Sequence, residues 1–198
     1  MSDQHKHIMT LLKSNQGYLT TRAAREQGVS NVTLHRMVSR GELIRLAQGL
    51  YAAPDIIPDP YYIAQYRCPQ GVFSHETALF LHDLSDRTPL QLMMTIPTGG
   101  NTRLLTDPGM VFFYGKPALM ELGSQKMSTP YGLPIIAYNE ERTLCDCLRA
   151  ANKLDKDLVL TALKRYMKNP ESNKAQLLDY AEIFNIRDVV RRYLEVLS

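Results

Sequence analysis

The sequence predicts an α+β protein with two domains, and three observations carry this prediction. The first 53 residues contain three short helical segments, separated by glycines, and then a small β ribbon. Short apolar runs typical of strands follow between residues 90 and 138, and amphipathic helical segments fill the rest of the chain. At 198 residues the chain is long enough for two domains, each with its own core.

The positive charge of the chain is concentrated near its N-terminus. The formal net charge is +3, and hydrophobic and charged residues make up 44% and 22% of the sequence, as in an ordinary soluble globular protein. Residues 1–53 carry seven Lys and Arg residues against three Asp and Glu residues, a net charge of +4, so the remaining residues carry −1. A basic excess confined to one end predicts contact with a polyanion there.

Several classes of protein are disfavoured by what the sequence lacks. No apolar run reaches the roughly 20 residues that a transmembrane helix needs, and the N-terminus lacks the apolar core of a signal peptide. We therefore expect a cytoplasmic protein without membrane contact. Cys68, Cys145 and Cys147 form no CxxC pair, so we expect buried, reduced thiols rather than disulfides or a zinc site. The sequence indicates no cofactor and no metal.

Capping residues and glycines delimit the first two helices. A first helix is predicted over residues 3–15, with Gly17 ending it. Thr20 or Thr21 can then cap a short second helix over residues 22–27 through its hydroxyl group.

A turn, a third helix and a hairpin follow. Gly28 permits a tight turn, and Ser30 or Asn31 caps a third helix that ends at Gly41. Alternating apolar and polar residues then predict a β hairpin over residues 42–53. This order of elements is that of a winged helix-turn-helix, whose recognition helix enters the major groove of DNA.

The third helix carries polar and basic side chains on the side away from its apolar residues. At 100° per residue, Leu34, Met37 and Val38 lie together and are expected to face the core. Arginines and hydroxyl groups can bond base edges or phosphates, and valine can touch a thymine methyl group. A solvated helix face is the alternative, but the turn and the ribbon around this helix favour DNA. The predicted DNA contacts are Thr20, Thr21, Arg22, Asn31, Val32, Thr33, His35, Arg36, Ser39 and Arg40, with Arg45 and Gln48 on the ribbon.

The second domain is predicted to begin after a proline-rich linker. Residues 54–60 contain three prolines and connect an N-terminal domain over residues 1–53 to a second domain over residues 61–198. We expect a small mixed or antiparallel sheet with several helices. The predicted strands cover residues 90–97, 110–114 and 133–138. The predicted helices cover residues 61–65, 75–81, 140–150, 155–167, 174–184 and 188–197.

Four stretches of the sequence resemble the AbiEi antitoxin family. Residues 18–51, which end in RGELIRLAQGLY, resemble its winged-helix N-terminal domain. SHETAL at residues 74–79, TIP at residues 95–97 and NEERTLCDCLR at residues 139–149 resemble its C-terminal region. Many repressors share the winged-helix part, whereas the combination in this order is much more specific.

The resemblance implies a role in bacterial abortive-infection and type IV toxin–antitoxin systems, which act in phage defence. An antitoxin of this family represses its own bicistronic operon by binding inverted repeats in the double-stranded promoter DNA. Its C-terminal domain antagonises a nucleotidyltransferase toxin similar to AbiEii without needing a stable complex. The residues themselves predict DNA binding, whereas only the resemblance predicts the antitoxin role.

Polar residues of the second domain are candidates for the antitoxin function, and each has a competing structural role. Ser74 is placed to cap a helix, and Arg142 and Asp146 are spaced for an ion pair within one helix. His75 and His82 lack the spacing of a zinc-protease motif, and no residue is expected to be catalytic. The candidates are Ser74, His75, Glu76, Glu141, Arg142, Asp146, Lys164, Arg165 and Lys168.

Two other functions stay open. One is a plain winged-helix repressor whose C-terminal domain dimerises or binds an effector. The other is an enzyme, for instance a metal-dependent nuclease guided by its DNA-binding domain, for which Glu141 is the acidic residue to test. The basic residues near the C-terminus are suited to contact phosphates or an acidic partner, or form only a solvated face. These residues are Lys164, Arg165, Lys168, Arg191 and Arg192.

Overall fold

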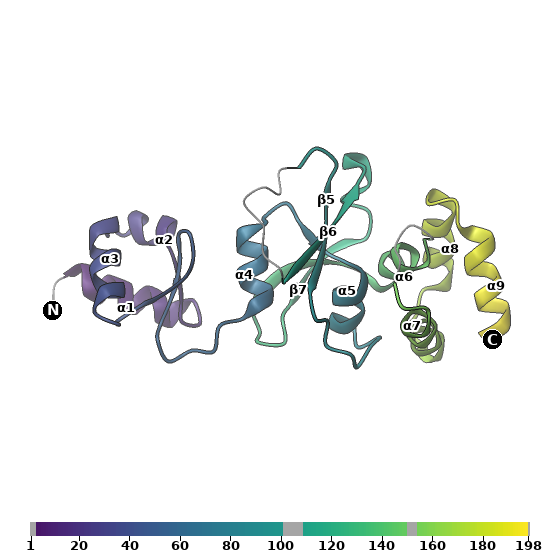
Figure 1. Cartoon of the computed structure of the whole chain (residues 1–198), viewed down its shortest axis with the longest axis horizontal. Coiled ribbons are helices and arrows are strands. Elements are labelled where there is room, and N and C mark those ends of the chain that lie inside the picture. Colours follow the sequence, from purple (N-terminus) through teal and green to yellow (C-terminus); the bar gives the residue numbers. More distant parts are fainter. Residues whose placement is uncertain (1–2, 101–108, 150–153, 198) are drawn as a thin grey trace. The chain divides into compact units, whose positions relative to one another are not determined.

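The computed structural model describes residues 3–100, 109–149 and 154–197, and the chain forms two compact units (Figure 1). The first unit ends at Arg67 and the second begins at Cys68. Each unit contains both helices and a sheet, so the predicted α+β class is confirmed.

The first unit has the element order of a winged helix. β3 pairs antiparallel with both β1 and β2, which gives the strand order β1-β3-β2. The helices and the hairpin were predicted, whereas β1 was not, because β1 pairs with residues 50–52, far along the chain, and no adjacent turn marks it as a strand. The elements are α1 (Asp3–Ser14), β1 (Tyr18–Thr20), α2 (Thr21–Glu26), α3 (Asn31–Ser39), β2 (Ile44–Ala47), β3 (Leu50–Ala52) and α4 (Pro60–Arg67).

Capping side chains set the helix starts in this unit. The Thr20 hydroxyl accepts a hydrogen bond from the Ala23 N–H (3.1 Å), so Thr20 rather than Thr21 caps α2. The Ser30 hydroxyl accepts one from the Thr33 N–H (3.1 Å), so Ser30 rather than Asn31 caps α3. A cap of this kind contributes about 0.5–2 kcal/mol to helix stability, which helps two short helices persist.

α4 belongs to the first unit, although the sequence predicts that the second domain begins at Tyr61. Asp59 is fully buried, and its carboxylate accepts hydrogen bonds from the N–H groups of Tyr61 and Tyr62. The Asp59 N–H donates to the Tyr18 hydroxyl (2.8 Å). The boundary between the compact units lies after Arg67. The proline-rich segment that was predicted to be a linker is bonded to β1 through Asp59.

The described residues of the second unit include a five-stranded mixed sheet in the order β6-β5-β4-β8-β7. β5 and β6 are parallel, as are β4 and β8, whereas the pairs β4–β5 and β7–β8 are antiparallel. β4 and β7 were not predicted, because β4 has two residues and β7 is a polar edge strand. The strands are β4 (Val72–Phe73), β5 (Leu92–Pro97), β6 (Met110–Gly115), β7 (Ser124–Ser128) and β8 (Pro134–Tyr138).

Helices complete the second unit. α6 packs against α5, α7 and α8, and α9 packs on α8 (Figure 1). Leu79, Leu144, Leu163 and Leu177 are fully buried in the core that these helices share. The predicted helix over residues 140–150 is observed to Leu148, and Ala150 lies outside the described residues. The helices are α5 (His75–Leu81), η1 (Pro117–Leu119), α6 (Glu140–Leu148), α7 (Lys156–Lys168), α8 (Lys174–Ile183) and α9 (Arg187–Leu197).

The three cysteines are buried thiols, as predicted, and none of them is paired in a disulfide. Burial raises the pKa of Cys145 to about 12 and raises the pKa values of Cys68 and Cys147. Because the thiolate is the nucleophile, we expect none of the three to react with iodoacetamide in the native chain at about pH 8. Mass spectrometry should find all three modified only after unfolding in urea. Rapid modification of a native thiol would contradict this prediction.

Candidate nucleic-acid interface

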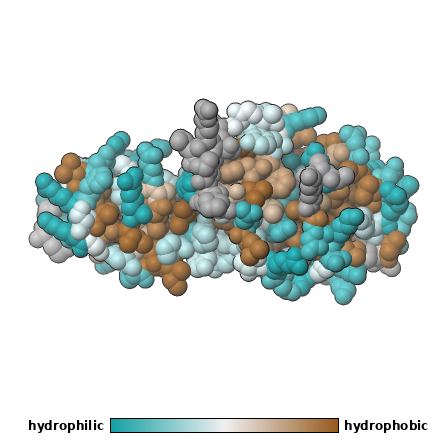
Figure 2. Space-filling view, viewed as in Figure 1, coloured by the Kyte–Doolittle hydropathy of each residue, from teal (hydrophilic) through white to brown (hydrophobic). Residues whose placement is uncertain are grey.

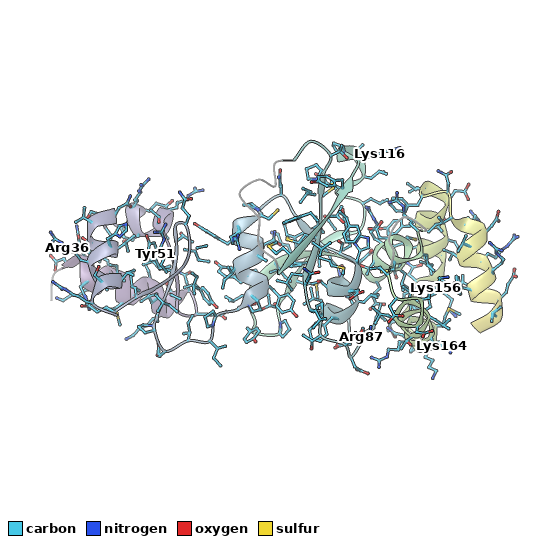
Figure 3. All side chains as sticks on the ribbon, viewed as in Figure 1. Arg36, Tyr51, Arg87, Lys116, Lys156 and Lys164 are labelled. Atoms are coloured by element: carbon cyan, nitrogen blue, oxygen red, sulfur yellow. The ribbon has the colours of Figure 1, made fainter. Side chains whose placement is uncertain are left out.

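α3 presents its polar side to solvent. Leu34 and Met37 are buried in the core of the first unit with Ile8 and Leu19, as predicted for the apolar face. The opposite side is open, and Arg36 projects from α3 away from this core (Figure 3). The exposed residues of α3 and its C-terminal cap are Asn31, Val32, His35, Arg36, Ser39 and Arg40.

The hairpin of β2 and β3, which we call the wing, carries two exposed polar residues. Arg45 and Gln48 are exposed, while Ile44 and Leu46 are half-buried. The strand register shifts between Arg45 and Ala47, which marks a β-bulge. The Arg45 Nε donates to the Ala47 carbonyl oxygen (3.4 Å), so this side chain lies along the wing beside the turn.

Three of the predicted DNA contacts use their hydroxyl groups inside the protein. The Thr20 hydroxyl caps α2. The Thr21 hydroxyl and N–H both donate to the Gly49 carbonyl oxygen (3.3 and 2.8 Å). The Thr33 hydroxyl donates to Gln4 Oε1 (2.6 Å) on α1. These threonines position α2, the wing and α1, so they are less available to DNA than the exposed side chains of α3.

Arg22 and Arg40, which are predicted DNA contacts, form exposed ion pairs. Arg22 Nε lies 3.0 Å from Glu26 Oε1, and Arg40 Nη1 lies 3.9 Å from Glu42 Oε1. The arginine side chains are 90% and 71% exposed. Water and salt screen such pairs, so they contribute little to stability and either guanidinium can exchange its carboxylate for a phosphate.

In the second unit, Arg142 holds several elements together. Its Nε donates to Asp146 Oδ2 (2.9 Å), and its Nη1 donates to the carbonyl oxygens of Leu119 (2.8 Å) and Leu122 (2.9 Å). The guanidinium carbon lies 4.2 Å from the ring centroid of Tyr138 and 4.5 Å from that of Phe184. Burial raises the pKa of the Asp146 carboxyl, and the Arg142 charge opposes that rise.

Glu141 is committed to the same helical core. It is buried, and its Oε1 accepts a hydrogen bond from the Tyr166 hydroxyl (2.9 Å) on α7. Burial first, and this carboxylate second, raise the pKa of Tyr166. Glu76 on α5 is half-buried and lies near Cys147, where it contributes to the raised pKa of that thiol. Both carboxylates therefore face the packing between helices.

Ser74 and His75 are buried at the start of α5. Ser74 stands at the N-cap position, but its hydroxyl makes no capping bond, so the predicted side-chain cap is wrong. Instead Ser74 Oγ accepts a hydrogen bond from Thr95 Oγ1 (2.9 Å) and lies 2.8 Å from His75 Nδ1. His75 adopts φ +52° and its ring stacks on Phe113, with 3.6 Å between centroids. These contacts join α5 to β5 and β6.

Among the predicted basic residues of α7, Arg165 is paired with an acidic residue, whereas the two lysines are exposed. Arg165 donates to both carboxylate oxygens of Asp86 and to the Asp83 carbonyl oxygen, and it lowers the pKa of Asp86. Lys164 and Lys168 are exposed, and the viewed face is hydrophilic in the region of α7 (Figure 2). On α9, Arg191 pairs with Asp188 and Glu195.

A pocket of about 420 Å³ in the second unit was not predicted. Its lining includes Gln70, Pro97, Met120, Glu121 and Ile136, which come from separate stretches of the chain, so no local pattern could indicate it. Within the described ranges, no group of three or more His, Cys, Asp or Glu residues is arranged to hold a metal ion. The described helices also include none that is long and apolar enough to cross a membrane.

Comparison with known proteins identifies the first unit and the overall fold type. Residues 7–54 match the model of a family described as the AbiEi antitoxin transcriptional regulator. The crystal structure of the RV2827C protein from Mycobacterium tuberculosis is similar, with a TM-score of 0.59 and 15% sequence identity over 92% of this chain and 72% of that chain. At this identity the likeness shows the fold alone. No curated protein sequence matches the chain.

The family match covers α3 and the wing and ends before the SHETAL and NEERTLCDCLR stretches. The resemblance predicted from the sequence is therefore confirmed for the N-terminal region. Over residues 7–54 the chain is similar to the AbiEi antitoxin family of transcriptional regulators.

Proposed function

We propose that the protein represses transcription of its own operon by binding DNA and is the antitoxin of a type IV toxin–antitoxin, abortive infection system. The observation that carries this proposal is the exposed side of α3, where His35, Arg36, Ser39 and Arg40 lie opposite the buried residues. This helix lies within the region that matches the antitoxin regulator family. Such side chains bond base edges and phosphates in the major groove.

The wing and the charge of the N-terminal region support the same mode of binding. With α3 in the major groove, Arg45 and Gln48 are placed to contact the adjacent backbone or minor groove. The net charge of +4 on residues 1–53 predicts that affinity falls steeply as salt concentration rises. An inverted repeat has two half-sites, so two copies of the chain would bind one operator.

We assign the antitoxin role to the second unit, acting on a nucleotidyltransferase toxin without a stable complex. The support is the family match together with the resemblance of residues 74–79 and 139–149 to the C-terminal region of this family. The nuclease alternative loses support because Glu141 is buried and bonded to Tyr166. We therefore propose a protein without catalytic residues.

A double substitution in the full chain should separate the two activities. We expect Arg36→Ala with Arg40→Ala to abolish repression of the promoter but to keep protection against the toxin, because both side chains are exposed on α3, far in sequence from the second unit. The measurement is promoter activity from a reporter, together with growth of cells that also express the adjacent gene, which this proposal expects to encode a nucleotidyltransferase.

Arg187→Ala is the matched control, since Arg187 is an exposed arginine of α9 paired with Glu182. It should leave both repression and growth unchanged. Full repression by the double variant would rule out α3 as the DNA-reading helix. Growth arrest with a double variant that still accumulates would contradict the proposed division of labour.

The second candidate function is a plain repressor whose second unit binds an effector or dimerises. The pocket of about 420 Å³ in that unit is the observation that favours it. In this case the wild-type chain would repress the promoter yet fail to protect cells from the toxin. The same growth assay therefore distinguishes the two functions.

A further inference from the structure

α4 lies against the strands of the wing. Tyr62 and Tyr66 are one helical turn apart on α4, so they share one side of it. The Tyr62 ring meets the Tyr18 ring of β1 edge-on, with centroids 4.9 Å apart. The Tyr66 hydroxyl lies over the wing turn, since a Cβ added to Gly49 would stand 2.9 Å from it. Burial, and then the neighbouring Tyr51 of β3, raise the pKa of Tyr66.

The position of α4 is fixed at its start. The fully buried Asp59 carboxylate accepts hydrogen bonds from the Tyr61 N–H (2.9 Å) and the Tyr62 N–H (3.2 Å). The Asp59 N–H donates to the Tyr18 hydroxyl (2.8 Å). α4 therefore begins at a point that is bonded to β1, an edge strand of the sheet in the winged-helix unit.

The wing turn meets side chains of both α4 and α2. A Cβ placed on Gly49 would stand 2.9 Å from the Tyr66 hydroxyl and 3.3 Å from the Thr21 hydroxyl. Thr21 also binds the Gly49 carbonyl oxygen through its N–H (2.8 Å). Gly49 has φ +79° and lacks a side chain, so both neighbours can approach its backbone closely. We call Thr21, Gly49 and Tyr66 the wing clamp.

A clamp of this kind matters because the wing is small. β2 has four residues and β3 has three, and a hairpin of that size is marginally stable in water by itself. β3 also pairs with β1, whereas β2 is an edge strand that pairs only with β3 in this sheet. The proposed DNA-contacting residues of the wing, Arg45 and Gln48, stand on β2 and immediately before Gly49. A wing that moved freely would lose conformational freedom on binding DNA, and affinity would fall accordingly.

We propose that α4 holds the wing where Arg45 and Gln48 reach DNA, and that Tyr66 is the positioning residue of this arrangement. This inference rests on the proposed DNA binding. It extends the DNA-binding unit beyond the β hairpin, to the end of α4 at Arg67.

The test uses the full chain and a duplex of the promoter region upstream of its gene. We expect Tyr66→Ala to weaken binding about three- to tenfold, the factor that corresponds to ordering one or two mobile groups. Hydroxyl-radical footprinting should show loss of backbone protection where the wing lies, with protection of the backbone that flanks α3 retained. Gly49→Ala, which perturbs the clamp from the wing side, should do the same.

A double-mutant cycle separates positioning from general destabilisation. In a chain that already carries Arg45→Ala and Gln48→Ala, the Tyr66→Ala substitution should change affinity less than about twofold, because the wing contacts are gone. Tyr66→Phe removes only the hydroxyl that lies over Gly49 and should reproduce a large part of the loss of affinity. Tyr131→Ala, at a half-exposed tyrosine of the second unit, should have no effect.

The possible outcomes test the inference about α4 and the proposed DNA binding separately. A wild-type chain that binds the duplex, together with a Tyr66→Ala chain that keeps the wing footprint, would overturn the inference alone. An equal loss of affinity with and without Arg45 and Gln48 would also overturn it. A wild-type chain that does not bind the duplex would overturn the proposed function, and the inference with it. If Tyr66→Ala does not fold, Tyr66→Phe and Gly49→Ala decide the question.

Discussion

Replacing Arg142 with alanine should destabilise the second unit by about 3–5 kcal/mol, because it leaves the buried Asp146 carboxylate without its main partner. The substitution also removes hydrogen bonds to the carbonyl oxygens of Leu119 and Leu122 and the contacts with two aromatic rings. Urea unfolding followed by circular dichroism measures the loss, since the chain contains no tryptophan for fluorescence.

Arg149 is the matched control for this prediction. It lies about two helical turns further along the chain than Arg142 and also pairs with Asp146, at 3.6 Å, but its side chain is 44% exposed. Because solvent screens that pair, Arg149→Ala should cost no more than about 1 kcal/mol. Equal losses for the two variants would show that Arg142 is not the residue that holds α6, the loop after η1 and α8 together.

Replacing Arg36 with alanine should weaken binding to the operator by about 1–3 kcal/mol if its guanidinium pairs with a base, and should relax the preference at that base pair. Arg36 is exposed near the centre of the side of α3 that faces away from the core. Mobility-shift titration of the full chain against a set of operators, each with one base pair changed, measures both effects.

The salt dependence of the same titration shows which kind of contact Arg36 makes. If Arg36 binds only phosphate, Arg36→Ala should weaken all operators equally and reduce the slope of log affinity against log salt by about one. Arg187→Ala should change neither quantity, because Arg187 is an exposed arginine of the second unit. An Arg36→Ala chain with wild-type affinity and wild-type base preference would exclude both kinds of contact.

The sequence predicts many of the helices and strands of the second unit correctly. Its longer helices and three of its strands lie near their predicted positions, since apolar spacing within each segment reports which side is buried. Apolar spacing does not reveal β4 and β7. β4 is too short to show a period, and β7 is stabilised by pairing with β8 rather than by apolar residues of its own.

The roles of individual polar residues were harder to predict. Arg142 and Asp146 do form the ion pair that their spacing suggests. The spacing could not show that the guanidinium also binds two carbonyl oxygens of a distant loop and lies against Phe184. In the same way, the sequence predicts that Thr33 contacts DNA, whereas in the structure its hydroxyl donates a hydrogen bond to Gln4 of α1.

The sequence by itself therefore determined the winged-helix order, the buried face of α3 and the exposed side that carries Arg36, because these depend on residues within a few positions of one another. The tertiary structure alone decided that α4 joins the first unit, that Tyr66 lies over Gly49, and that Glu141 of α6 bonds to Tyr166 of α7. Those contacts join residues that are distant in sequence, and only the packing of whole elements brings them together.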